Sequence, residues 1–168
     1  MPASPQHSTP SPAADLLPAA LAASIAAAAK ASRRFAEVSI DAADGAVRCL
    51  AAGPESPAHY LVHQSGGRFF VSLTMADRYL SQSIEQDLVH TGDKMTDLLH
   101  DELVDLGSAV AAPAVEHFRS PPPAKLFTFR SAVGITSADA NASKCAGELL
   151  MAYETVFGHL GGMAGDDD

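Results

Sequence analysis

Bulky hydrophobic residues near the start of the chain recur at helical spacing. Leu17, Leu21 and Ile25 stand four positions apart, and steps of three or four continue through Ala28 and Ser32 to Phe35, with alanines in most of the places between. This spacing puts the bulky side chains on one face of a helix, so the segment 16–32 predicts an amphipathic, alanine-rich helix. The expected buried stripe consists of Leu17, Leu21, Ile25, Ala28, Ser32 and Phe35.

Two pairs of alternating segments then predict two β-hairpins. The sequences FAEVSID and AVRCLAA flank a turn that contains Asp-Gly at 44–45, and HYLVHQ and RFFVSLT flank Ser-Gly-Gly at 65–67. Glycine-containing turns between alternating runs are typical of hairpins. In the last of these segments Phe69, Val71 and Leu73 are two positions apart, so they share one face of the sheet.

The centre of the chain shows helical spacing that a glycine interrupts. Asp77 is placed to cap a helix, and Gly92 breaks the apolar pattern of that helix. Asp93 can cap a second helical piece, which ends at Gly107. The pattern predicts a long central helix with a kink or a one-turn break near Gly92.

Two further strands, VEHFRS and KLFTFRSAV, are predicted on either side of a proline loop at 121–123. Alternation places Phe127 and Phe129 on one face of the sheet, and Phe118 is expected to join them. If the two strands pair, Arg119 and Arg130 are both expected on the opposite face.

The chain closes with a helix that Ser137 is expected to cap. The order is helix, three or four strands, central helix, two strands, helix, without regular βαβ alternation. It predicts the α+β class, with a largely antiparallel sheet of about five strands covered by an N-terminal, a kinked central and a C-terminal helix. We expect one domain over 15–162, between a disordered Pro/Ser-rich lead-in at 1–14 and a disordered acidic tail at 163–168.

Charge narrows the classes of partner. The net charge of the 168-residue chain is −9, and residues 77–105 hold eight acidic residues against two basic ones. Such a field repels phosphate backbones and anionic lipid surfaces, so we expect neither nucleic-acid nor membrane binding.

The cysteines and the first predicted helix indicate which cellular compartment the protein occupies. Cys49 and Cys145 stand in no CxxC motif, so buried thiols and a reducing cytoplasm are expected. The segment 16–32 has no basic residue before Lys30 and is rich in weakly apolar alanine, so it predicts neither a signal peptide nor a spanning helix. Whether it is ever processed as a signal stays open.

An acidic row is the most conspicuous candidate site. Asp93, Asp97, Asp101 and Asp105 recur every fourth residue and span about 120° of a helix surface, opposite the leucines. The simplest interpretation is a solvated helix face. A docking surface for a basic partner, pairing within the chain and a metal site are the alternatives, although a straight helix does not wrap a cation.

Arg119 and Arg130 are the second candidate, because an arginine can bind a carboxylate with two hydrogen bonds. They could bind a partner or pair with the acidic helix of this same chain. The candidate partner-binding residues are therefore Asp97, Asp101, Asp105, Arg119 and Arg130.

Catalytic and cofactor motifs are missing from the sequence. There is no GxSxG, no complete phosphate-binding loop and no closely spaced metal ligands, so no catalytic residue, cofactor or metal is expected. His59 and His63 lie in a predicted strand, where four residues separate them by about 13 Å, too far to share an ion.

The element order, with KLFTFRSAVGI running into a closing amphipathic helix and a repeated Phe-Arg-Ser, resembles the type III secretion chaperone-like fold and the YbjN-like proteins that share it. The resemblance covers residues 15–162. It implies a small, acidic, cytoplasmic protein, usually a homodimer and non-catalytic, that binds extended segments of other proteins. The expected function is thus a non-enzymatic protein-binding or chaperone-like module; the alternative is a small-ligand- or metal-dependent enzyme or regulator. The alanine-rich first helix and the proline-rich lead-in depart from that class.

Overall fold

Six strands form one antiparallel sheet in this computed structural model, which describes residues 16–54, 56–91, 94–108, 110–134, 140–160 and 163. The order across the sheet is β1-β2-β3-β4-β6-β5, and every neighbouring pair is antiparallel. The strands are β1 (Phe35–Ile40), β2 (Val47–Ala51), β3 (Ala58–Ser65), β4 (Arg68–Met75), β5 (Glu116–Arg119) and β6 (Phe127–Ala132). Both predicted hairpins and the α+β class are confirmed.

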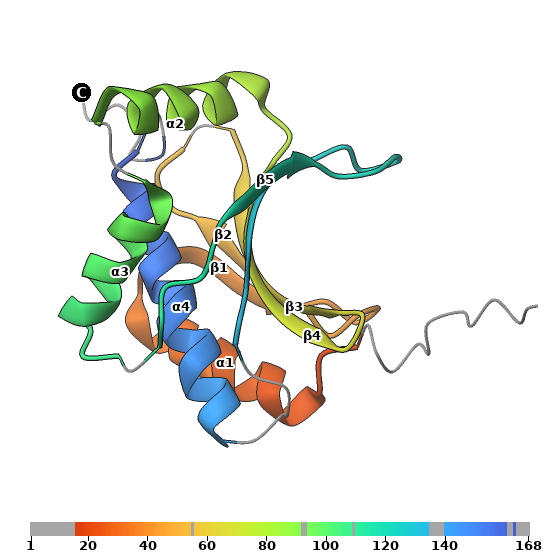
Figure 1. The fold of residues 1–168 in the computed structure, drawn as a ribbon. Helices are drawn as coiled ribbons and strands as arrows, with labels where there is room; N and C mark the ends of the chain where they lie inside the picture. The colour runs from red at the N-terminus through yellow and green to blue at the C-terminus, as the bar shows by residue number, and fades with distance from the viewer. Residues whose placement is uncertain are drawn as a thin grey trace, which may run out of the picture.

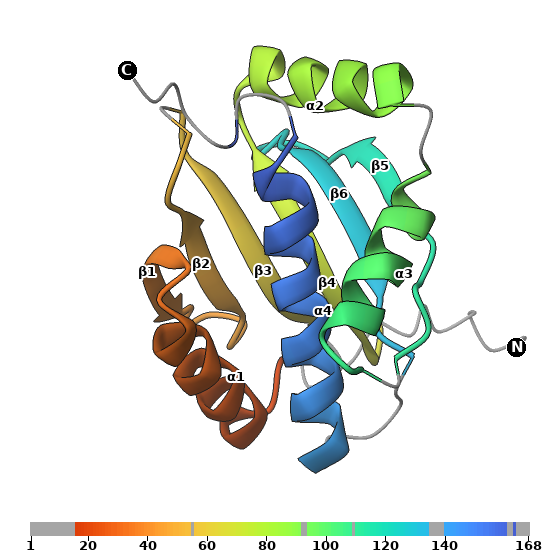
Figure 2. The same ribbon diagram turned by 90° about the vertical axis from the view of Figure 1, so that its left-hand side faces the viewer.

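Helices cover one face of this sheet. They are α1 (Ala19–Ser32), α2 (Arg78–Thr91), α3 (Met95–Asp105) and α4 (Ala140–Gly158). Helix α4 crosses β3 and β4 and packs between α1 and α3, whereas α2 lies across one end of the sheet (Figure 1, Figure 2). Figure 1 shows the β3–β4 and β5–β6 hairpins projecting to the other side, where none of the described helices lies. The core therefore sits between α1, α3, α4 and the sheet.

The first helix is confirmed, but its buried stripe differs from the expected one. Ala28 faces solvent, whereas Leu17 and Phe35 contact the core from outside the helix. Small side chains let α1 lie close to α4, and the stripe widens toward that neighbour. The buried residues of α1 are Leu21, Ala22, Ile25, Ala26 and Ala29.

The turn of the first hairpin holds the start of α1. The Leu17 amide donates to the Asp44 carbonyl oxygen at 3.0 Å. Gly45 has a φ of +70°, and a Cβ atom there would lie 2.7 Å from the Leu17 carbonyl oxygen. Only glycine fits this contact, because other side chains resist both the conformation and the close approach.

The predicted kinked helix is two separate helices, α2 and α3, which run in different directions (Figure 2). Asp77 caps α2 as expected, since its Oδ1 accepts from the amides of Tyr79 (2.7 Å) and Leu80 (3.1 Å). Hydrogen bonds from the Ser56 hydroxyl, and then from these amides, lower the pKa of Asp77. Lys94 precedes α3, and the predicted capping residue Asp93 lies outside the described residues, as does Gly92.

The predicted ends of the domain fall mostly outside the described residues. The lead-in 1–14, the cap at Ser137 and nearly all of the tail belong to that part of the chain. Met163 is described and is buried, with 3% of its surface exposed, so the packed region extends past the expected limit at 162.

Candidate binding site on the helix-free face of the sheet

The register between β5 and β6 separates the two candidate arginines. Phe118 lies opposite Thr128, and Arg119 lies opposite Phe127. Directly opposed residues in an antiparallel pair share a face. Phe118 therefore lies on the helix-free face with Arg130, and Arg119 lies on the other face. The predictions that both arginines share a face, and that Phe118 joins the other two phenylalanines, were wrong.

Arg130 is held in place by a carboxylate and two aromatic rings. Its Nε and Nη2 donate to Glu116 Oε2 at 3.1 and 2.9 Å. Its guanidinium carbon is 4.3 Å from the ring centre of Phe70 and 4.9 Å from that of Phe118. Cation–π contacts and a forked ion pair restrict the rotamers of this side chain, so the arginine is ordered before any ligand arrives.

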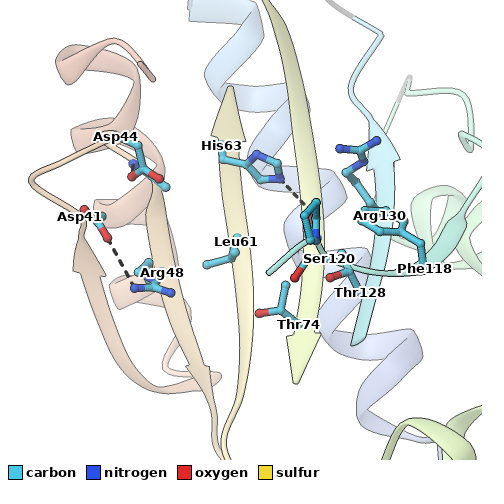
Figure 3. A pocket seen from close by; sticks show the side chains of 13 residues that line it. Asp41, Asp44, Arg48, Leu61, His63, Thr74, Phe118, Ser120, Thr128 and Arg130 are labelled. Atoms are coloured by element: carbon cyan, nitrogen blue, oxygen red, sulfur yellow. Dashed lines mark hydrogen bonds and ion pairs between the residues drawn. The ribbon is translucent and has the colours of Figure 1, made fainter. Parts of the chain in front are cut away.

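A cavity of about 320 Å³ lies on this face, at the lower end of the range for ligand pockets. Its walls come from the β1–β2 turn, from β3 and β4, and from the β5–β6 hairpin (Figure 3). We call this cavity the trough. The residues labelled in Figure 3 are Asp41, Asp44, Arg48, Leu61, His63, Thr74, Phe118, Ser120, Thr128 and Arg130.

His63 lies in the middle of the trough. Its Nε2 is 2.8 Å from the Ser72 hydroxyl, and its ring stacks on Phe70 with 5.5 Å between centres. Burial lowers the pKa of His63 to about 4, and the nearby Arg130 acts in the same direction, whereas Asp44 opposes them. The imidazole is therefore neutral at pH 7 and offers one donor and one acceptor.

The two ends of the trough carry balanced charges. At one end Arg48 pairs with Asp41 at 3.4 Å, and at the other Arg130 pairs with Glu116. These arginines stand on β2 and β6, which are three strand spacings apart, or about 14 Å. Because each guanidinium is already paired with a carboxylate, the two ends offer no excess positive charge with which to bind a small anion. An extended ligand that crosses the strands, with polar groups at intervals, fits better.

The contact between His63 and Ser72 does not make a nucleophilic site. A serine nucleophile must reach its substrate, but only 1% of the surface of Ser72 is exposed. It lies within β4 rather than on a sharp turn. Within the part of the chain that the structure describes, no cluster of three His, Cys, Asp or Glu side chains could hold a metal ion.

Three members of the acidic row, Asp97, Asp101 and Asp105, lie on α3, which packs on the face of the sheet opposite the one that carries Arg130 (Figure 1). The fourth, Asp93, lies outside the described residues. Asp97, Asp101 and Asp105 are exposed. No ion pair among the described residues joins them to the arginines, because Arg130 binds Glu116 and Arg119 Nε donates to the Lys125 carbonyl oxygen at 3.3 Å. Pairing of Asp97, Asp101 and Asp105 with these arginines was therefore a wrong prediction.

Replacing Asp97, Asp101 and Asp105 together by Asn tests the remaining interpretations of this row. Like charges four positions apart repel by a few tenths of a kcal/mol per pair, so we expect stability to be unchanged or slightly raised. The gain should be larger at about 20 mM salt than at about 500 mM, because salt screens the repulsion. Thermal melts at both salt concentrations measure it. A loss of stability at low salt would contradict a solvated face.

Sequence reasoning did not single out most of the trough. Alternation in HYLVH did place His59 and His63 on one face, but it did not indicate that His63, and not His59, lines the trough. The remaining walls come from segments far apart in the chain, and Arg48 and Asp41 carry no local motif. The one usable signal was that these strands carry polar side chains on one face of the sheet, whereas their other face is buried.

Comparisons with known proteins found no match. No family model matches the chain, and no curated protein and no solved structure matches it either. The resemblance to the type III secretion chaperone-like fold therefore stays a prediction. None of the helices in the described residues has both the length and the apolar character that crossing a membrane requires.

Proposed function

We propose that the protein is a non-enzymatic, chaperone-like module of the cytoplasm that holds an extended segment of another protein in the trough. The observation that carries this proposal is the ordered Arg130, stacked between Phe70 and Phe118 at the wall of a cavity on the helix-free face. Arginine and aromatic side chains in enclosed positions dominate the binding energy of protein interfaces.

The chemistry of the trough suits a peptide backbone. An extended segment has unpaired amide and carbonyl groups at regular intervals, and it can bind wherever donors and acceptors are spaced across several strands. Arg48, His63 and Arg130 lie on three different strands of the trough. Carboxylates neutralise the two arginines, and His63 is uncharged at pH 7 because its pKa is low. A segment therefore needs no strong charge to enter the trough.

A small-ligand enzyme is the second candidate. The contact of 2.8 Å between His63 and Ser72 favours it, because a histidine within reach of a hydroxyl is a common catalytic pair. The burial of Ser72 and the low pKa of His63 weigh against it, since a general base works best with a pKa near the working pH.

The homodimer stays a prediction. Strands β1 and β5 form the two edges of the sheet, and edge strands offer unpaired backbone groups to a second copy. Ile40, at the end of β1, is 45% exposed and would be covered by such pairing.

Photo-crosslinking in the full chain tests the proposal. Phe118 is replaced by the photoreactive residue benzoylphenylalanine, which keeps an aromatic ring at the wall of the trough. Tyr79, which is 81% exposed on α2, is replaced in the same way as a control. Crosslinking in a native lysate is expected to capture a defined segment at position 118 and not at 79. The captured segment is then sequenced and synthesised as a peptide.

Calorimetry with this peptide decides whether the trough binds it. Arg130→Gln is expected to weaken binding at least about tenfold, since truncating a hot-spot arginine costs about 2 kcal/mol or more and about 1.4 kcal/mol corresponds to tenfold. Arg119→Gln, on the other face of the same hairpin, is the matched control and should bind like the parent. Equal affinities of the peptide for the parent, Arg130→Gln and Arg119→Gln would refute the proposal.

A further inference from the structure

We infer that the trough has a competing ligand within the chain itself, the Pro/Ser-rich segment 1–15, so that partner binding requires its displacement. This inference rests on the proposed function of the trough. It names the chemistry that the trough accepts, a proline-containing extended segment, and it adds regulation by competition.

The attachment point of the segment lies at the rim of the trough. The Leu17 amide donates to the carbonyl oxygen of Asp44, and Asp44 lines the trough. Leu17 itself is buried, with 3% of its surface exposed, so its position is fixed. Residues that precede it must therefore start from the β1–β2 end of the trough.

The segment is long enough to cross the trough. From β2 to β6 is about 14 Å, and a polyproline II strand rises about 3.1 Å per residue, so about five residues suffice. The chain has fifteen residues before Leu16. The tether is thus longer than the span that it has to bridge, and it imposes no strain on docking.

The composition of the segment fits the walls. Four of its residues are proline, and it has no bulky aliphatic side chain with which to build a core of its own. Proline-rich segments dock in grooves with aromatic walls and lose little entropy there, and their carbonyl groups stay free to accept hydrogen bonds. Phe118 lines the trough and provides an aromatic surface, and Arg48 and Arg130 provide donors.

Tethering makes even a weak contact effective. A short flexible tether gives an effective concentration of about 1 mM, so a segment with an intrinsic Kd of about 100 µM would occupy the trough about 90% of the time. A competing partner would then bind about tenfold more weakly than to an empty trough. Any process that removes or occupies the segment would raise partner affinity by that factor.

Paramagnetic broadening in the full chain tests the docking directly. A nitroxide is attached to a cysteine introduced by Ser8→Cys in a chain that also carries Cys145→Ala. Cys49 is fully buried and burial raises the pKa of its thiol to about 12, so it should stay unlabelled. We expect the amide signals of Phe118 and Thr128 to lose most of their intensity, and that of Leu103 on α3 to keep it.

Two variants make the test specific. In the labelled chain Arg130→Gln should restore the signals, whereas the matched Arg119→Gln should not. Broadening that is absent, or that is equal on both faces of the sheet, would overturn the inference.

Competition is measured separately, with the synthetic peptide whose sequence the crosslinking experiment identified. Replacing Pro2, Pro5, Pro10 and Pro12 by Gly in the unlabelled full chain should tighten its binding about tenfold. An unchanged affinity would overturn the inference while leaving the proposed function intact. Failure of the peptide to bind any variant would refute the proposed function, and the broadening experiment would still decide whether the segment docks.

Discussion

Replacing Leu21 by Asp is expected to lower the free energy of unfolding by at least about 3 kcal/mol, because an unpaired carboxylate would enter the core and a leucine would leave it. Leu21 is 6% exposed and lies on the buried side of α1. Denaturant unfolding of variant and parent measures the difference.

Ala23→Asp is the matched control, since Ala23 lies two positions away on the exposed side of α1. Aspartate has a lower helix propensity than alanine, so this substitution alone should lower the free energy of unfolding by about 0.5 kcal/mol. Similar midpoints for Leu21→Asp and the parent would show that α1 does not pack on the sheet as described.

Local patterns were enough to predict most elements of the fold. Helix α1 follows from apolar spacing, α2 from its Asp77 cap, and the β3–β4 hairpin from its Gly66-Gly67 turn, where both glycines have positive φ. Each of these signals lies within one element or one turn. Tertiary packing is consistent with these local signals.

The orientation of the two arginines could not be predicted in this way. Alternation within each strand was correct, but the relative phase of β5 and β6 depends on how many residues the loop between them uses. The observed register pairs His117 with Phe129, and a shift of one residue would exchange the faces of one whole strand. Nothing in the proline loop fixes that number at the level of sequence.

The β5 edge also carries contacts that no sequence pattern indicated. His117 stacks on Phe129 with 4.0 Å between ring centres, and its Nε2 pairs with Glu85 on α2. Its Nδ1 lies 3.1 Å from the Thr128 carbonyl oxygen. These contacts tie α2 to the strand that carries Phe118, so they also steady one wall of the trough.

The stability of the protein is expected to fall between pH 6.5 and pH 4 because of His63. In the folded chain the pKa of His63 is lowered to about 4 from its ordinary value of 6.5. Above pH 6.5 the imidazole is neutral in both the folded and the unfolded chain, so it imposes no cost. As the pH falls, His63 becomes protonated in the unfolded chain but stays neutral in the folded chain, so unfolding becomes more favourable. The loss levels off below about pH 4.

By linkage this shift corresponds to a loss of about 2–3 kcal/mol at pH 4.5, which urea unfolding at pH 7.5 and 4.5 measures. His63→Gln keeps a polar group near the Ser72 hydroxyl and cannot take up a proton, so its loss should be smaller by about 2 kcal/mol. His100→Gln, on the exposed surface of α3, should behave like the parent. If His63→Gln and the parent lose the same stability, the imidazole is solvated rather than enclosed. The trough would then lack the uncharged centre that makes it suitable for a peptide backbone.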